Sequence, residues 1–216
     1  MPDIGMILIK TVVIGDPSVG KTALIRRFVD QEFHAASQPT NGQDFASTTF
    51  RLDAATNIKV QLIDNSGDEK YKAVLPTYRN IANAVLAVYD VTNRQSFDNV
   101  VSWIDSFLAG SNSHAIPTII IVGNKVDKDR RQVSRQEGQQ FAAMHSYLFM
   151  ETSALRSDSV DEAFQILLTD AFHAMNERMN LQSAGSCKAE VNEGQPEHYK
   201  DIVDHAVDAW DWIFRS

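Results

Sequence analysis

The chain has 216 residues, 44% of them hydrophobic, and carries a formal net charge of −8. This length suits one domain with a sizeable core and an appendage. The negative charge argues against nucleic acid as a general partner, because binding to nucleic acid is driven by clustered Lys and Arg. A single cysteine excludes an intramolecular disulfide and suits a reducing compartment.

Targeting signals are not apparent in the sequence. Residues 1–5 carry no basic region before the first apolar run, unlike a signal peptide. No apolar stretch approaches the ~20 residues needed to span a bilayer. We therefore expect a cytoplasmic protein, recruited to membranes, if at all, through protein partners.

A glycine-rich motif near the N-terminus organises the chain. An apolar run at residues 7–14 precedes it, and a helix-like pattern begins at Ala23. Strand, G-x-x-x-x-G-K-T loop and helix is the context of a phosphate-binding loop, whose backbone N–H groups and helix dipole bind phosphate oxygens. The alternative is a glycine-rich turn that happens to carry a lysine. The motif consists of Gly15, Asp16, Pro17, Ser18, Val19, Gly20, Lys21 and Thr22. We expect Lys21 to reach the outer phosphates and the Thr22 hydroxyl to ligate Mg²⁺.

The rest of the chain alternates between apolar runs and helical periodicity. Strands are predicted at residues 58–63, 84–89, 118–122 and 147–150, and helices at 96–108, 134–145 and 159–180. Ser134 with Glu137, and Ser159 with Glu162, fit the capping box at a helix start. Residues 43–52 should form a hairpin with the strand at 58–63. The pattern predicts a doubly wound α/β fold, with a mostly parallel six-stranded sheet and one antiparallel strand.

A second motif ends the strand at 58–63. Asp64 and Gly67 frame a D-x-x-G sequence there. A carboxylate at this point can hold Mg²⁺ through water, and the Gly67 N–H can meet the terminal phosphate. Alone this motif would be read as a turn, but here it follows a phosphate-binding loop.

Two further motifs indicate which base is bound. Asn124, Lys125 and Asp127 form an N-K-x-D sequence after the strand at 118–122. The Asp127 carboxylate can accept two hydrogen bonds from guanine, which adenine cannot offer in that arrangement, while the Lys125 stem can cover one face of the base. Ser153 and Ala154 follow the next strand, where a backbone N–H can meet the guanine carbonyl. Read singly, these motifs would be ordinary loops; together and in order they select guanine.

With these motifs the chain resembles the small Ras-like GTPases, most closely the Rab branch, over residues 7–175. The spacing agrees, because Thr40 lies 18 residues after Thr22. Short sequences typical of Rab proteins recur at residues 40–45, 88–92, 96–100, 103–104 and 121–125. The resemblance implies a monomeric P-loop GTPase that binds GTP or GDP with Mg²⁺ and meets effectors, exchange factors and activating proteins.

The resemblance also implies roles for individual residues. Thr40 would be the switch I threonine that senses the γ-phosphate through Mg²⁺, so Thr22, Thr40 and Asp64 form the candidate metal set. Phe33 would pack against the guanine edge. Switch I would lie around residues 33–45 and switch II around residues 64–78. Asp68, Lys21 and Thr40 are the candidate catalytic residues.

One departure from the family concerns hydrolysis. Asp68 stands where the family has a glutamine that orients the attacking water. A carboxylate there would face the charge of the γ-phosphate and could not donate to it, so we predict slow intrinsic hydrolysis. Asp68 could alternatively turn outward as a solvated residue, or act as a general base.

Other departures affect the nucleotide and effector surfaces. Pro17 has no N–H and a fixed φ within the phosphate loop. Leu155 replaces a lysine that covers the second face of the base, so we expect a modest loss of affinity. Ile63 replaces the tryptophan of an aromatic trio offered to effectors, whose other members match Phe45 and Tyr78. Asn41 replaces an exposed apolar residue, and effector choice should therefore differ.

The C-terminal segment, 181–216, should be a linker followed by an amphipathic helix. From Glu177 to the end, eight acidic side chains stand against four basic ones. The prenylated terminal cysteines of Rab proteins are missing, so lipid anchoring is not encoded; Cys187 is read as an exposed thiol or, alternatively, a palmitoylation site. The apolar stripe includes Trp210 and Phe214, and its acidic opposite face favours docking on protein over insertion into a membrane.

The sequence therefore leaves three hypotheses for function. The first is a Rab-like switch that regulates vesicle traffic by binding effectors in its GTP state. The second is a hydrolysis-impaired Rab mimic that sequesters effectors or exchange factors. The third, another P-loop enzyme such as an ATPase or kinase, is opposed by the motif from Asn124 to Asp127.

Overall fold

The computed structural model describes residues 7–34, 40, 42–53, 56–109 and 116–185. Residues 35–39 and 41 of the predicted switch I segment, and the predicted tail helix, lie outside these residues. Residues 1–178 form one compact unit, and a second unit begins at Met179. Among the described residues, no helix is both long enough and apolar enough to cross a membrane.

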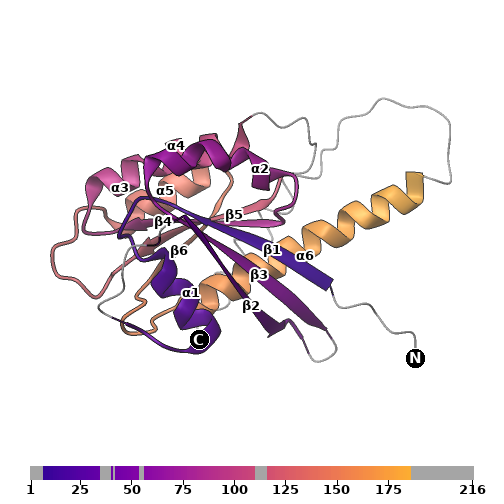
Figure 1. The fold of residues 1–216 in the computed structure, drawn as a ribbon, viewed down its shortest axis with the longest axis horizontal. Coiled ribbons are helices and arrows are strands. Elements are labelled where there is room, and N and C mark those ends of the chain that lie inside the picture. The colour runs from indigo at the N-terminus through magenta and orange to yellow at the C-terminus, as the bar shows by residue number, and fades with distance from the viewer. Residues whose placement is uncertain (1–6, 35–39, 41, 54–55, 110–115, 186–216) are drawn as a thin grey trace. The chain divides into compact units, whose positions relative to one another are not determined.

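A six-stranded sheet forms the centre of the first unit (Figure 1). Its strands are β1 (Ile7–Ile14), β2 (Gln43–Arg51), β3 (Asn57–Asn65), β4 (Ala84–Asp90), β5 (Thr118–Asn124) and β6 (Leu148–Thr152). Their order is β2-β3-β1-β4-β5-β6, with β2 antiparallel to β3 and all other pairs parallel. The predicted α/β class, six-stranded sheet and antiparallel hairpin are confirmed.

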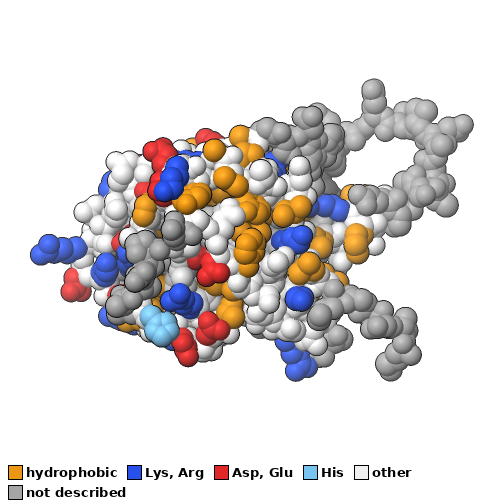
Figure 2. Space-filling model, in the orientation of Figure 1, with side chains coloured by type: hydrophobic (Ala, Val, Ile, Leu, Met, Phe, Trp, Pro, Cys, Tyr) orange, Lys and Arg blue, Asp and Glu red, His pale blue; other side chains and the backbone are white. Residues whose placement is uncertain are grey.

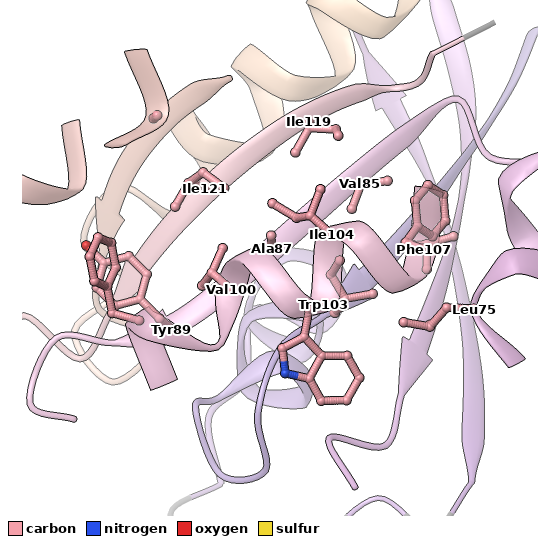
Figure 3. Packing of buried hydrophobic residues seen from close by; sticks show 14 of the residues in the cluster. Leu75, Val85, Ala87, Tyr89, Val100, Trp103, Ile104, Phe107, Ile119 and Ile121 are labelled. Carbon is pink, nitrogen blue, oxygen red and sulfur yellow. The ribbon is translucent and has the colours of Figure 1, made fainter. Parts of the chain in front are cut away.

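Helices cover both faces of this sheet. The larger ones are α1 (Lys21–Asp30), α4 (Val100–Leu108), α5 (Arg135–Met144) and α6 (Val160–Gly185). In Figure 1, α1 and α6 lie on the face opposite to α4 and α5. Phe28 of α1 stacks on Phe164 of α6, with ring centroids 4.1 Å apart. On the other face, Trp103 and Phe107 of α4 pack over Val85 and Ala87 of β4 (Figure 3).

The predicted helix at 96–108 differs from the structure. It begins earlier and is divided into α3 (Arg94–Asp98) and α4. The Asn93 side chain caps α3 by accepting from the backbone N–H of Ser96 at 3.3 Å. Ser96, predicted as the first residue of the helix, lies instead within its first turn, where its hydroxyl donates to the Asn93 carbonyl at 2.7 Å. Asn99, between the two helices, keeps right-handed helical dihedrals.

The two predicted capping boxes have different outcomes. The Ser134 side chain accepts from the backbone N–H of Glu137 at 3.1 Å, as predicted, and α5 follows it. Ser159 stands in the left-handed region, with φ of 50°, which is not the extended geometry of a capping box. The predicted helix at 159–180 is present, and it continues to Gly185 as α6.

A short helical segment follows β3, where no helix was predicted. It comprises the 3₁₀ helix η1 (Glu69–Val74) and α2 (Pro76–Arg79). Pro76 begins α2 at a position where its missing N–H costs nothing, because the first N–H groups of a helix have no partner within it. This segment lies within the predicted switch II.

Candidate functional site

The phosphate-loop motif follows β1 and leads directly into α1. Gly15 and Gly20 have φ of 137° and 103°, a region that side chains rarely adopt. A Cβ on Gly15 would lie 2.2 Å from the Val88 carbonyl oxygen of β4. The two glycines of the motif are therefore required by backbone geometry, and they place this loop at the carboxyl end of the sheet.

Lys21 folds back over this loop from the first turn of α1. Its Nζ donates to the carbonyls of Gly15, at 2.9 Å, and Asp16, at 2.7 Å. Burial lowers the pKa of Lys21 to about 8, although the nearby Asp64 and Asp16 carboxylates oppose that shift. A buried cation above a loop of backbone N–H groups is suited to phosphate oxygens.

The Asp16 side chain is held by two donors, Asn99 at the start of helix α4 and Trp103 within it. Asn99 Nδ2 donates to one carboxylate oxygen at 2.8 Å, and Trp103 Nε1 donates to the other at 2.7 Å. Both oxygens are therefore satisfied by uncharged donors. Neither Asn99 nor Trp103 was predicted as a site residue, because each reads in sequence as an ordinary helix position.

Two hydroxyls and a carboxylate meet beside Lys21. Thr22 Oγ1 lies 2.5 Å from Asp64 Oδ2 and 2.8 Å from Thr40 Oγ1, and Thr40 Oγ1 lies 3.4 Å from the same carboxylate oxygen. Asp64 Oδ1 is buried without a hydrogen-bond partner in the described part of the chain. Burial raises the pKa of Asp64. A cluster of oxygen donors with one buried oxygen unsatisfied fits a hard divalent cation such as Mg²⁺.

The glycine of the D-x-x-G motif lies against the phosphate loop. A Cβ on Gly67 would lie 2.3 Å from the backbone nitrogen of Pro17 and 2.4 Å from the carbonyl carbon of Asp16. No larger residue fits unless one of these backbones moves. The D-x-x-G glycine therefore lies beside the phosphate loop.

Asp68 is engaged at the start of η1. Its carboxylate accepts from the backbone N–H of Lys70 at 3.2 Å and pairs with the ammonium group of Lys70 at 2.8 Å. Its hydrogen bonds with Lys70 lower the pKa of Asp68. Of the alternatives raised by the sequence, this geometry matches the outward-turned, solvated residue, which also caps the switch II segment.

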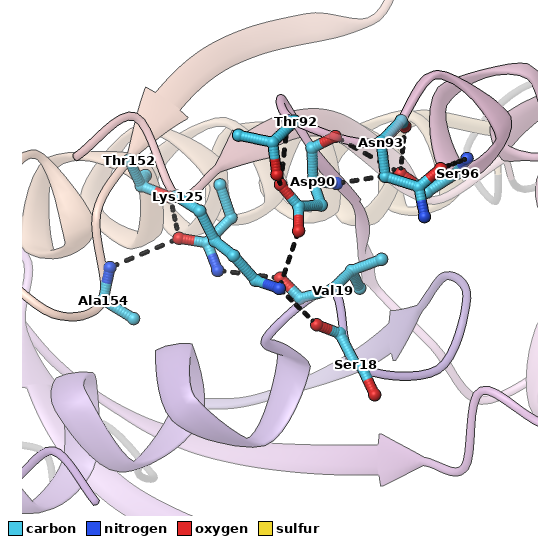
Figure 4. Close-up of polar contacts among 10 residues, drawn as sticks. Ser18, Val19, Asp90, Thr92, Asn93, Ser96, Lys125, Thr152 and Ala154 are labelled. Carbon is cyan, nitrogen blue, oxygen red and sulfur yellow. Dashed lines mark hydrogen bonds and ion pairs between the residues drawn. The ribbon is translucent and has the colours of Figure 1, made fainter. Parts of the chain in front are cut away.

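The N-K-x-D motif holds the phosphate loop from the other side (Figure 4). Asn124 Nδ2 donates to the Val19 carbonyl at 2.9 Å, while its Oδ1 accepts from the Ala154 N–H at 3.2 Å. Asn124 is almost completely buried. One side chain therefore joins the loops that follow β1 and β6, although these segments lie far apart in sequence.

Lys125 crosses the same region with a backbone φ of 68°. Its Nζ donates to the Ser18 carbonyl at 2.5 Å and pairs with Asp90 at 2.7 Å (Figure 4). Burial alone raises the pKa of Asp90, but hydrogen bonds from Lys125 and Thr92 outweigh it and leave the pKa lowered. Asp90 was missed in the sequence. Its place at the carboxyl end of β4 was the available signal.

Asp127 and the loop after β6 complete the set of residues that were predicted to contact the base. Ser153 Oγ donates to Asp127 Oδ1 at 2.5 Å, which fixes the carboxylate that was predicted to read guanine. Leu155 is 52% exposed. Phe33 lies at the exit of α1, with the Arg27 guanidinium 5.8 Å from its ring centroid.

The predicted effector trio is only partly available at the surface. Phe45 is 58% exposed, whereas Ile63 is 2% exposed and packs in the core. Tyr78 donates from its hydroxyl to Gln43 Oε1, and Gln43 in turn donates to Asn65 Oδ1 at 3.0 Å. Ile63 therefore cannot replace the missing tryptophan as a contact.

Comparison with known proteins agrees with this geometry. A sequence model described as Ras family matches residues 10–173. The GTP-binding protein ypt3 of Schizosaccharomyces pombe is 42% identical over 172 residues, which cover 79% of each chain. Ras-related protein RABA2d of Arabidopsis thaliana is 38% identical, covering 85% of this chain and 84% of its own. Ras-related protein Rab-8B of Pongo abelii is 39% identical, covering 83% and 86%. The chain belongs to the Ras family of small GTPases and, within it, to the Rab branch.

Proposed function

We propose that this protein is a Rab-like molecular switch that binds GTP, hydrolyses it slowly to GDP and regulates vesicle traffic through partners that recognise the GTP state. The observation that carries the proposal is that the loop at residues 15–22 is bonded to the N-K-x-D motif, and that Asn124 of this motif also bonds the loop after β6. Asn124 reaches Val19 and Ala154, and Lys125 reaches Ser18. Phosphate-binding and guanine-reading groups are thereby arranged as one site.

At the phosphate end, the chain supplies donors and one cation. The backbone N–H groups of residues 15–22 would cradle the phosphates, except at Pro17, which has none. Lys21 would exchange its two carbonyl partners for the outer phosphates, which would restore its full charge. Thr22 and Thr40 would hold Mg²⁺ directly and Asp64 through water. When bound, Mg²⁺ would supply positive charge that offsets the negative charge of the phosphates.

At the base end, Asp127 would select guanine. Its Oδ1 is fixed by Ser153, so the carboxylate is oriented before the base arrives. Pre-orientation reduces the conformational cost of binding. The Lys125 stem would cover one face of the base, while Phe33 and Leu155 would border it on other sides. The Ala154 N–H would exchange its bond with Asn124 for the guanine carbonyl or share it with that group.

Switching would depend on the γ-phosphate. Thr40 would be held through Mg²⁺, and Gly67 through its backbone N–H. Gly67 lies so close to the backbone of Asp16 and Pro17 that a Cβ would not fit between them, so a movement of the phosphate loop would be felt at Gly67. Loss of the γ-phosphate would therefore release both switch segments, and a partner that contacts them could distinguish GTP from GDP.

Partners would bind an exposed apolar surface near these segments. Phe45, Val74 and Ile81 are each at least 38% exposed although they are large and hydrophobic. Figure 2 shows hydrophobic side chains gathered across the middle of one face, with charged groups around them. Such surfaces favour protein partners. Effectors, exchange factors and activating proteins are the proposed classes, with the GTPase itself a monomer recruited from the cytoplasm.

A second candidate function, the hydrolysis-impaired mimic, is favoured by the state of Asp68. Its carboxylate is committed to Lys70 and to capping η1, so it neither orients water nor donates to the γ-phosphate. Such a protein would retain GTP and sequester effectors or exchange factors. Single-turnover hydrolysis with and without an activating protein separates the candidates, because only a cycling switch is stimulated.

The primary test is competition between GTP and ATP for the purified protein, with Mg²⁺ present and absent. We expect excess GTP, but not ATP, to displace a fluorescent GDP. Thr22→Asn should weaken the Mg²⁺-dependent GTP complex more than the GDP complex. Equal displacement by ATP would contradict guanine selection, and equal loss of both complexes would contradict the metal role of Thr22.

A further inference from the structure

Arg27 joins two segments that border the proposed base site. It lies in the last turn of α1, a helix that otherwise leads from the phosphate loop toward switch I. Its Nε donates to the Ala154 carbonyl at 3.0 Å, and one terminal nitrogen donates to the Leu155 carbonyl at 3.2 Å. Both carbonyls belong to the loop after β6, more than 120 residues away in sequence.

The same guanidinium also contacts Gln31, the residue that ends α1. Its other terminal nitrogen donates to the Gln31 carbonyl at 3.0 Å. Gln31 caps the helix in the left-handed region, with φ of 57°, which is costly for a residue with a Cβ. Phe33 follows two residues later, with its ring centroid 5.8 Å from the guanidinium carbon. That distance is within the range of a cation–π contact.

We propose that Arg27 is a positioning residue that locks the loop at Ala154 and Leu155 to the switch I aromatic Phe33, and thereby slows release of the guanine nucleotide. The inference rests on the function proposed above, since it assumes that a base lies between these segments. An arginine suits the role because its planar fork can donate to three carbonyls at once. A lysine is a single point charge and could not hold all three in one geometry.

The effect on release follows from what the contacts restrain. The Ala154 N–H is the group expected to meet the guanine carbonyl, and Phe33 is the ring expected to close the base edge. A base can leave only if one of these walls moves. Opening the site therefore requires some of the Arg27 contacts to break, whereas entry of a nucleotide into an already open site does not.

The experiment measures dissociation of fluorescent GDP, chased with excess GDP in Mg²⁺, from the full chain. Arg27→Gln should release the nucleotide at least about 10-fold faster, because loss of one hydrogen bond to a charged group is worth this much. Arg27→Lys, which keeps the charge and one contact, should fall between Arg27→Gln and wild type. The neighbouring Arg26→Gln is the matched control, since Arg26 makes none of these contacts, and it should release GDP at the wild-type rate.

Two further readouts separate positioning from general stability. The association rate constant should stay within about 2-fold of wild type in each Arg27 variant, given that only exit is restrained. Phe33→Leu should also accelerate release, and combining it with Arg27→Gln should add less than the sum of the separate effects. This coupling would not arise from a uniform loosening of the fold.

Several outcomes would overturn the proposal. These are release from Arg27→Gln at the wild-type rate, equal acceleration in the Arg26→Gln control, or full additivity with Phe33→Leu. A lower melting temperature with unchanged release would equally contradict it. Wild-type protein that binds no guanine nucleotide would instead count against the proposed function itself, and it would be recognised before any variant is compared.

Discussion

The indole N–H of Trp103 donates a hydrogen bond to the Asp16 carboxylate at 2.7 Å, linking the middle of helix α4 to the phosphate loop. Lys72 of η1 lies on the same indole, with its ammonium nitrogen 4.7 Å from the ring centroid. Lys72 also donates to Ser102 Oγ at 2.9 Å. One buried tryptophan therefore contacts both the loop expected to bind phosphate and the switch II segment.

Removing Asn99, the other donor to the Asp16 carboxylate, tests how much such hydrogen bonds to the phosphate loop contribute to stability, without opening a cavity in the core. Asn99→Ala should lower the free energy of unfolding by about 1.5–3 kcal/mol, the scale of a hydrogen bond to a charged group. Urea unfolding measures the loss. Asp16→Ala should cost less in the Asn99→Ala background than in wild type, because the two residues share one contact. Strict additivity would show that the contact contributes nothing.

The lowered pKa of Lys21 predicts a pH dependence of nucleotide binding. Below pH about 8 the amine is charged in the free protein, and above it the charge must be restored by taking up a proton as phosphate binds. Affinity for GDP should therefore fall by up to about tenfold for each pH unit above about 8. Titration calorimetry at a series of pH values measures the affinity for GDP, and a Cys187→Ser background removes the thiol from the measurement.

Folding stability should respond to the same group in the opposite direction. The folded pKa of about 8 lies below the ordinary value of 10.5, so the unfolded chain binds more protons between these two values. The nucleotide-free protein should therefore gain stability from this group as pH rises through that window. Lys21→Met is the control for both measurements, and it should abolish both trends. A wild-type affinity that stays level to pH 9.5 or so would contradict the shift.

Substitutions of Asp68 separate its charge from its capping role. Asp68→Gln should raise single-turnover GTP hydrolysis about tenfold, or about 1.4 kcal/mol, by supplying a neutral water-orienting amide. Asp68→Asn keeps a capping side chain without the charge but is too short to orient water, so its hydrolysis rate should stay near wild type. If Asp68→Gln is slower than wild type, Asp68 is acting as a base.

The lowered pKa of Asp68 adds a check on these rates. A carboxylate held below its ordinary pKa by Lys70 stays charged across neutral pH. Wild-type hydrolysis should consequently be level between about pH 6 and pH 8, where an ordinary aspartate no longer titrates. A rise through that range would indicate a base with a raised pKa and would contradict the observed pairing.

Asp127→Asn should weaken GTP binding by at least about 10-fold. The change removes the charge and presents a donor to the guanine N–H, and each lost charge-assisted bond is worth about 1.5–3 kcal/mol. It should also weaken the bond from Ser153. Equilibrium binding of GTP is the measurement, with Asp129→Asn, in the exposed part of the same loop, as the control. Unchanged binding by Asp127→Asn would refute its role in reading guanine.

The C-terminal segment can be tested by truncation after Ser186. The sequence predicts an amphipathic helix around residues 196–214 that docks on protein, since Asp201, Asp204, Asp208 and Asp211 would be repelled by anionic lipid. Docking on its own domain predicts a lower melting temperature for the truncated protein. Docking on a partner predicts unchanged melting and a lost pull-down. Liposome binding by the isolated segment, without either effect, would restore the membrane hypothesis.

The sequence by itself determined the sheet, its antiparallel hairpin and the motifs at the carboxyl ends of its strands. These features are encoded locally: Gly15 and Gly20 adopt backbone angles that side chains disfavour, and buried parallel strands require continuous apolar runs. Motifs at strand ends, such as Asn124–Lys125, can therefore be recognised in the sequence without knowledge of tertiary contacts. The family resemblance rested on the same residues.

Tertiary structure alone decided how these motifs are held together. Asn99, Trp103 and Arg27 carry no local signal for their contacts in the site. Asp16 lies 83 residues from Asn99 and 87 from Trp103, and Leu155 lies 128 residues from Arg27. The outward turn of Asp68 depended on Lys70 and on a 3₁₀ helix that periodicity did not reveal. Side-chain partners depend on packing between distant segments, and a pattern read along the chain cannot supply that packing.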